Sequence, residues 1–215
     1  MSDDGSYLRR QFKTAWLLTD LHLTGLDTEE CLWRPAAQGM HVQLDADGTW
    51  RADWPEHERY DLGPPSIAWV TWHMGFWWSM VLDHSFGAGT LTREAVMWPG
   101  TADGVRDWLG RLRGEWVAAL DKLSDSDLHS AQRTRWPFRD RPFGDVVAWV
   151  NVELTKNAAE LGYARFLYAV RRCLDTSTSG QSYWRRWPCS ASIPSRRSCC
   201  SARSAICPRA PATNR

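Results

Sequence analysis

His73 is the residue of this sequence best placed to do chemistry, because it lies inside the long apolar run Ser66–Trp78. An imidazole can bind a metal ion or transfer a proton, whereas packing alone would favour a hydrocarbon at this position. The best partners for it are Glu153 and Asn157, which are one helical turn apart and therefore point the same way. We take these three residues as candidate metal ligands.

Trp69 and Trp77 flank His73 one helical turn away on each side, and they are candidates to line a pocket together with Glu160. Each candidate also has an ordinary structural explanation. A single histidine among tryptophans is more often a hydrogen-bonded core residue than a ligand. The polar residues of the later segment also fit the solvated stripe of an amphipathic helix. From the residues alone both interpretations stay open.

Four helices and one hairpin are expected to position these residues. Apolar residues recur at helical spacing, with turn and capping residues between the runs, over about 6–25, over about 66–86, from Trp98-Pro-Gly to about Ser124, and from Asp140-Arg-Pro142 to about Arg172. Between the first two helices, His41–Leu44 and Thr49–Ala52 alternate around the turn Asp45-Ala-Asp-Gly, which predicts a small β-hairpin. The sequence therefore predicts an all-α four-helix bundle with a hairpin insertion.

The charge of the chain divides it into two unlike segments. Residues 1–172 contain 19 Lys and Arg against 24 Asp and Glu, whereas residues 173–215 contain seven Arg against one Asp. A mildly acidic body has no electrostatic footprint for nucleic acid. We expect residues 1–172 to form one domain, because 215 residues that are 43% hydrophobic, with 15 Trp, can build a sizeable core.

The cysteines divide at the same place, since Cys31 is the only one before residue 173. The body therefore cannot contain an internal disulfide, which is typical of a reducing cytosol. The acidic, polar start has no export signal, and the apolar stretch Ala68–Leu82 is too short to span a membrane. We expect a cytoplasmic protein without a membrane segment.

Residues 173–215 contain nine Ser, seven Arg, five Cys and four Pro, with neither periodicity nor apolar mass, and we expect them to be disordered. One interpretation is a basic arm for nucleic acid or anionic lipid. Another is a metal cluster, although these cysteines lack the paired spacing of zinc sites. The third, which we favour, is a shifted reading frame in a GC-rich gene, because the composition changes abruptly and Arg far outnumbers Lys.

Three segments together identify a family resemblance: Ser66–Met80, the helix from Trp98-Pro-Gly to Leu123, and Trp149–Leu167. Over roughly residues 5–172 the chain resembles the DinB-like superfamily, which includes the mycothiol-dependent maleylpyruvate isomerases. The resemblance implies a four-helix bundle in the up-down-down-up arrangement. It also implies one divalent metal, often zinc or nickel, held by a histidine of the second helix and a His-x-x-x-His pair of the fourth.

Carried over to this chain, the resemblance assigns His73 as the second-helix ligand. Glu153 matches the glutamate that replaces the first histidine of the pair in the maleylpyruvate isomerases, and Asn157 stands where the last histidine is expected. An amide oxygen is a neutral, hard donor and binds a borderline ion such as zinc much more weakly than imidazole does. We therefore expect the metal to be weakened or absent.

Two functions follow from these residues. The first is a metal-dependent thiol transferase or isomerase, in which the ion lowers the pKa of a low-molecular-weight thiol, of the mycothiol type, and holds the thiolate facing a small-molecule substrate. Cys31 is not expected to serve as the nucleophile, because it has no recognisable partner. The second is a metal-free bundle that binds a small molecule, or another subunit as a homodimer, without chemistry.

Overall fold

The structure is a computed structural model that describes residues 4–57 and 59–178. Its long helices are α1 (Asp4–Leu23), α3 (Ile67–Phe86), α4 (Ala102–Leu120) and α6 (Phe143–Thr178). Shorter elements connect them: α2 (Thr28–Leu32), strands β1 (Val42–Leu44) and β2 (Trp50–Ala52), the 3-10 turns η1 (Tyr60–Leu62) and η2 (Arg93–Ala95), and α5 (Asp125–His129). The predicted all-α class with a small hairpin is confirmed.

The helices begin where side chains can bond to free backbone N–H groups. Ser66 caps α3 by accepting a hydrogen bond from the backbone N–H of Trp69, and Thr101 caps α4 in the same way. Ser124 and Asp127 form a reciprocal capping box at the start of α5. Helix α4 ends at Leu120, before the end that the periodicity predicts near Ser124, and Ser124 is instead the N-cap of α5.

The hairpin has the predicted position and turn. Its strands pair antiparallel with Val42 opposite Ala52 and Leu44 opposite Trp50. Gly48 supplies the positive φ of 80° that the connecting turn requires. The insertion packs through its tryptophan onto the segment that precedes α4, because the rings of Trp50 and Trp98 meet edge to face at 5.3 Å.

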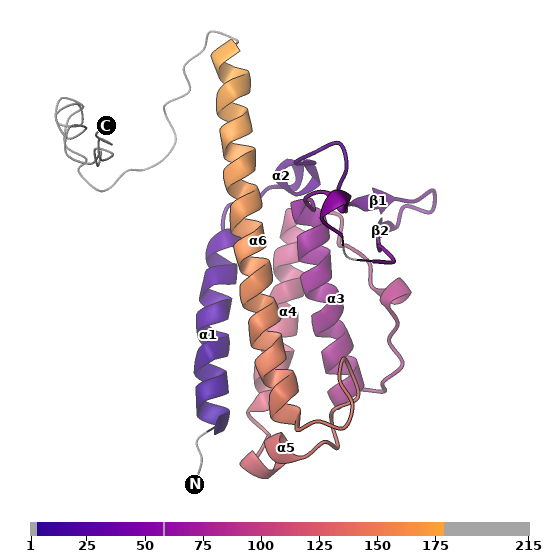
Figure 1. Cartoon of the computed structure of the whole chain (residues 1–215), viewed down its shortest axis with the longest axis vertical. Helices are drawn as coiled ribbons and strands as arrows, with labels where there is room; N and C mark the ends of the chain where they lie inside the picture. Colours follow the sequence, from indigo (N-terminus) through magenta and orange to yellow (C-terminus); the bar gives the residue numbers. More distant parts are fainter. Residues whose placement is uncertain (1–3, 58, 179–215) are drawn as a thin grey trace, which may run out of the picture. The chain divides into compact units, whose positions relative to one another are not determined.

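Contacts between the long helices define how they run, and Figure 1 shows the four lying side by side. Helices α1 and α6 run in the same direction. Asn151, in the first half of α6, donates a hydrogen bond to Leu8 near the start of α1, and Arg165, further along α6, donates one to His22 near the end of α1. Helix α3 runs opposite to α6, since the rings of Phe86 and Phe143 meet where one helix ends and the other begins. These directions bring the middle of α3 against the middle of α6.

Helix α6 continues to Thr178, past the end predicted near Arg172. Residues 179–215, and with them most of the predicted disordered segment, lie outside the described residues. The division of the chain at residue 172 therefore stays a prediction.

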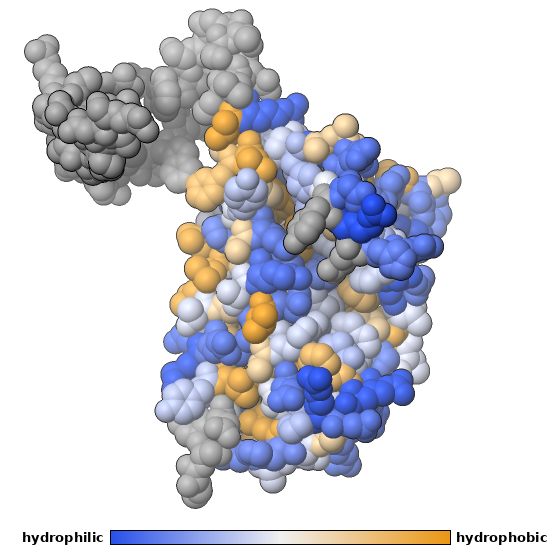
Figure 2. All heavy atoms as spheres, viewed as in Figure 1, coloured by the Kyte–Doolittle hydropathy of each residue, from blue (hydrophilic) through white to orange (hydrophobic). Residues whose placement is uncertain are grey.

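Aromatic and aliphatic side chains of α3, α4 and α6 fill the core, which is centred on α3; its fully buried residues include Trp72, Trp77, Trp78 and Trp116. Apolar side chains also remain on the surface of α1 and α6, where Figure 2 shows orange patches along one edge of the molecule. Within the described residues, no helix is both long enough and apolar enough to cross a membrane.

Candidate functional site

The candidate residues come from two facing helices. Trp69, His73 and Trp77 follow one another at four-residue intervals on α3, and Glu153, Asn157 and Glu160 occupy one side of α6. Helix α3 is apolar on nearly every side because other elements surround it, which explains why His73, in the middle of the helix, is drawn into the interior.

His73 is held flat against an aromatic ring and is kept neutral. Its ring stacks on Trp69 with centroids 4.9 Å apart and planes 8° from parallel. Burial is the largest cause that lowers its pKa, to about 4, and the nearby Lys156 ammonium lowers it further. A side-chain hydrogen bond with Asn157 acts in the opposite direction. At neutral pH the imidazole is therefore uncharged, the form that can bind a metal ion.

One nitrogen of His73 has no partner. Its Nδ1 atom is buried and makes no hydrogen bond in the structure. A buried polar group without a partner costs free energy, on the order of 1–3 kcal/mol. A bound ligand or ion is one explanation of such an atom, although the indole N–H of the core residue Trp78 is buried without a partner in the same way.

Asn157 is fully buried and its amide is bonded on both sides. Its Oδ1 accepts a hydrogen bond from the indole N–H of Trp77 at 3.0 Å, and its Nδ2 donates to Glu160 Oε2 at 2.9 Å. The structure thus joins three of the predicted site residues in a chain from α3 to the surface of α6. The oxygen that would have to bind a metal is already the acceptor of a protein hydrogen bond.

Glu153 is also engaged, by a residue that the sequence analysis overlooked. Lys156 Nζ lies 2.8 Å from Glu153 Oε2 as an ion pair without the geometry of a hydrogen bond, and the carboxylate side chain is only 16% exposed. The Glu and Lys are three residues apart on a helix, a spacing that favours ion pairs and could have been read from the sequence. Lys156 therefore places a positive charge close to both Glu153 and His73.

A divalent ion fits this set of donors poorly. Catalytic zinc usually has three strong protein ligands, whereas here one carboxylate is paired with an ammonium and the third donor is an amide oxygen bonded to Trp77. Among residues 4–57 and 59–178, no group of three or more His, Cys, Asp or Glu is arranged to hold a metal ion. The assignment of His73, Glu153 and Asn157 as ligands stays a prediction.

Cys31 offers no nucleophile to this site. It is fully buried, and burial, followed by the charges of Glu30 and Asp27, raises the pKa of its thiol to about 12. A thiol with such a pKa is protonated at neutral pH and is a weak nucleophile.

Comparison with known protein families shows which family has a sequence like that of this chain. The sequence model of the DinB superfamily matches residues 11–161, which include α3 and the part of α6 that carries the candidate site residues. The chain belongs to the DinB superfamily. The resemblance seen in the sequence is therefore confirmed at the level of the superfamily, and this DinB chain has its histidine, glutamate and asparagine on two facing helices. No curated protein and no solved structure matches it.

Proposed function

We propose that this DinB-superfamily chain is a metal-independent protein that binds a small molecule at the surface between α3 and α6. Its four long helices would form the up-down-down-up bundle of the family, and the ion pair of Glu153 and Lys156 would stand where other members hold an ion. Low-molecular-weight thiols, which the family implies, are the first ligands to test.

The occupation of both candidate donors on α6 carries this proposal. A bound cation would have to share Glu153 with the ammonium of Lys156, 2.8 Å from its Oε2, and share the oxygen of Asn157 with the indole N–H of Trp77. The ammonium of Lys156 already neutralises the carboxylate, so little electrostatic attraction for a divalent ion is left. Both contacts are supplied by the protein itself.

The surface around these contacts supports the binding of a small molecule. The partly exposed ring of His73 is stacked on the buried ring of Trp69, and the partly exposed groups of Lys156, Glu153 and Glu160 supply charges of both signs beside it. An apolar wall with a few polar groups is typical of small-molecule sites.

A metal-dependent thiol transferase or isomerase is the second candidate. One observation favours it: two of the three candidate ligands have a buried atom without a hydrogen-bond partner, Nδ1 of the neutral His73 and Oε2 of Glu153. In that case Lys156 would have to turn to solvent, which its 46% exposure permits.

Metal analysis of protein purified without chelator separates the two candidates. Less than about a tenth of an equivalent of zinc, nickel, iron or manganese, together with saturable binding of glutathione, bacillithiol or mycothiol by the metal-free protein, supports the proposal. A half equivalent or more of one metal, lost in His73→Gln, supports the transferase. As a control, Glu115→Gln removes an exposed carboxylate of α4 and should change neither result.

The cytoplasmic location, the homodimer and the lack of nucleic-acid binding stay predictions from the sequence, and the proposal depends on none of them.

A further inference from the structure

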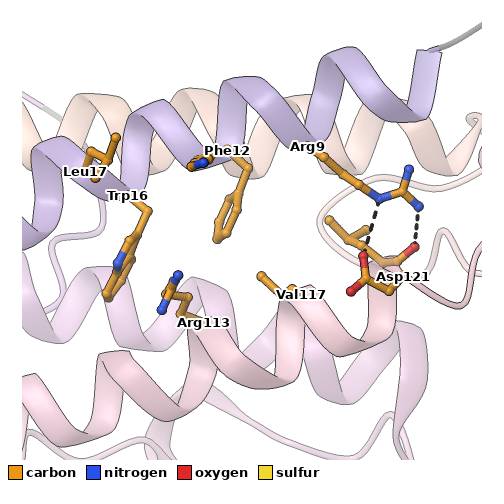
Figure 3. A pocket seen from close by; sticks show the side chains of 9 residues that line it. Arg9, Phe12, Trp16, Leu17, Arg113, Val117 and Asp121 are labelled. Carbon is orange, nitrogen blue, oxygen red and sulfur yellow. Dashed lines mark hydrogen bonds and ion pairs between the residues drawn. The ribbon is translucent and has the colours of Figure 1, made fainter.

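A hollow lies between α1 and α4, formed by residues other than those of the candidate site at His73. It has a volume of about 270 Å³. Figure 3 shows Phe12 and Trp16 pointing from α1 toward α4, and Arg113 and Val117 pointing back from α4. We propose that this pocket binds a small organic anion with a flat apolar body, such as an aromatic carboxylate.

The walls are apolar and held in place from behind. Phe12 and Leu120 are almost fully buried, and Trp16 and Val117 are partly exposed beside them. The rings of Phe12 and Trp16 both pack on Trp78 of α3, with centroids 5.8 and 6.1 Å away. An aromatic wall supported by a core tryptophan keeps its shape, so a flat ring can enter without much rearrangement.

The two ends of the pocket are fixed by arginines. Arg9 donates to the backbone oxygen of Leu120 at 2.7 Å and pairs with Asp121 at 3.6 Å, as the dashed lines in Figure 3 mark. At the other end the guanidinium of Arg113 lies over the ring of Trp16, 5.2 Å from its centroid. Both contacts hold long side chains that would otherwise move freely.

The charges at the rim select an anion. Three cations line the pocket, Arg9, Lys13 and Arg113, against the single carboxylate of Asp121. Asp121 is already paired with Arg9, and in the described part of the chain neither Lys13 nor Arg113 forms an ion pair. Two unpaired cations over apolar walls fit an amphipathic anion, whose ring replaces water in the hollow while its carboxylate faces the rim.

A pair of ligands that differ in charge alone tests this on the intact protein. Naphthalene-2-carboxylate is expected to bind the full chain with a Kd of about 0.1–1 mM, at least about tenfold tighter than naphthalene-2-carboxamide. Calorimetry or ligand-observed NMR at low salt measures both. Equal binding of the acid and the amide, or no saturable binding of the acid below about 5 mM, would overturn the proposal.

Variants locate the binding. Lys13→Gln with Arg113→Gln should weaken the carboxylate at least about fivefold, whereas Arg111→Gln with Lys122→Gln, exposed cations of the same region that do not line the pocket, should leave it unchanged. Val117→Trp fills the hollow and should abolish binding. Its matched control is Val152→Trp, which replaces an exposed valine on the surface of α6.

Two outcomes of the variant series contradict the proposal. One is a carboxylate affinity that survives Val117→Trp in protein whose circular dichroism is unchanged. The other is a wild type that sediments as a dimer and binds no carboxylate, together with a Val117→Trp variant that sediments as a monomer. That result would assign the hollow to a contact between two copies of the chain.

Discussion

Lys156 Nζ lies 2.8 Å from Glu153 Oε2, on the side of α6 that also presents Asn157 to α3. This ion pair gives a carboxylate of the candidate metal site a partner from its own helix, one turn away. It also brings a positive charge toward His73, whose pKa it helps to lower. The behaviour of the site therefore depends on Lys156 as much as on the three residues that the sequence singles out.

The lowered pKa of His73 predicts a loss of stability in mild acid. Because the folded pKa, about 4, is below the usual 6.5, the unfolded chain takes up the proton first as the pH falls. Stability that is fully present above pH 6.5 is thus lost toward pH 4, by about 2 kcal/mol after allowance for screening of a partly exposed ring.

Urea unfolding at pH 7 and pH 4.5 measures this loss, and His73→Gln should show a smaller one. His22 and His41, whose pKa values are also lowered mainly by burial, are present in both proteins and cancel in the comparison. An equal loss in the wild type and in His73→Gln would contradict the assignment. In Lys156→Met the pKa of His73 should rise but stay below 6.5, because burial is the larger cause.

The hydrogen bond from Trp77 to Asn157 predicts unequal effects of two neighbouring substitutions. Trp77→Phe leaves the buried Oδ1 of Asn157 without its donor, whereas Trp78→Phe removes an indole N–H that is itself buried without a partner. The loss of side-chain volume is the same, so Trp77→Phe should lower the free energy of unfolding by about 1–3 kcal/mol more than Trp78→Phe. Chemical denaturation measures the free energy of unfolding of both variants. Equal losses of that free energy would mean that the hydrogen bond contributes nothing to stability.

Arg165 joins the end of α1 to α6 and should matter for stability. It donates to Glu30 Oε1 at 2.9 Å and to the backbone oxygens of His22 and Thr24 at 2.8 Å. Since Glu30 is buried, Arg165→Met should cost about 2–4 kcal/mol. Arg59→Met, which breaks an exposed pair with Asp61, should cost less than about 0.5 kcal/mol. Similar midpoints for the two variants in a thermal melt would refute this ranking.

The long helices could be predicted from the sequence because their apolar spacing and caps are local. Ser66 and the turn around Gly48 have the roles that their residue types indicate. The short helices α2 and α5 were missed because five residues are too few for a periodic pattern. At the site, the contacts of Trp77 and Asn157 join residues eighty positions apart, which spacing along one helix cannot reveal.

Gly75 lies where α3 packs tightly against Trp108 of α4. A Cβ atom added there would run into the ring of Trp108, whereas one added at Gly110 would meet open space. Gly75→Ala should therefore destabilise the protein by about 2 kcal/mol or more. Gly110→Ala in the same pair of helices should stabilise it by up to about 1 kcal/mol, because alanine restricts the unfolded chain and favours helix. If the urea midpoints of Gly75→Ala and Gly110→Ala moved in the same direction, the tight contact between Gly75 and Trp108 would be contradicted.

The most direct test is to titrate zinc into the wild type and into Asn157→His. Calorimetry measures the binding, and NMR detects the response of the His73 ring signals. Asn157→His supplies the imidazole that the resemblance expects, and zinc prefers it to an amide oxygen. We expect no saturable zinc binding by the wild type below about 100 μM and one equivalent bound by Asn157→His, with the His73 signals shifted. One equivalent bound tightly by the wild type, with the same shift and loss in His73→Gln, would contradict it.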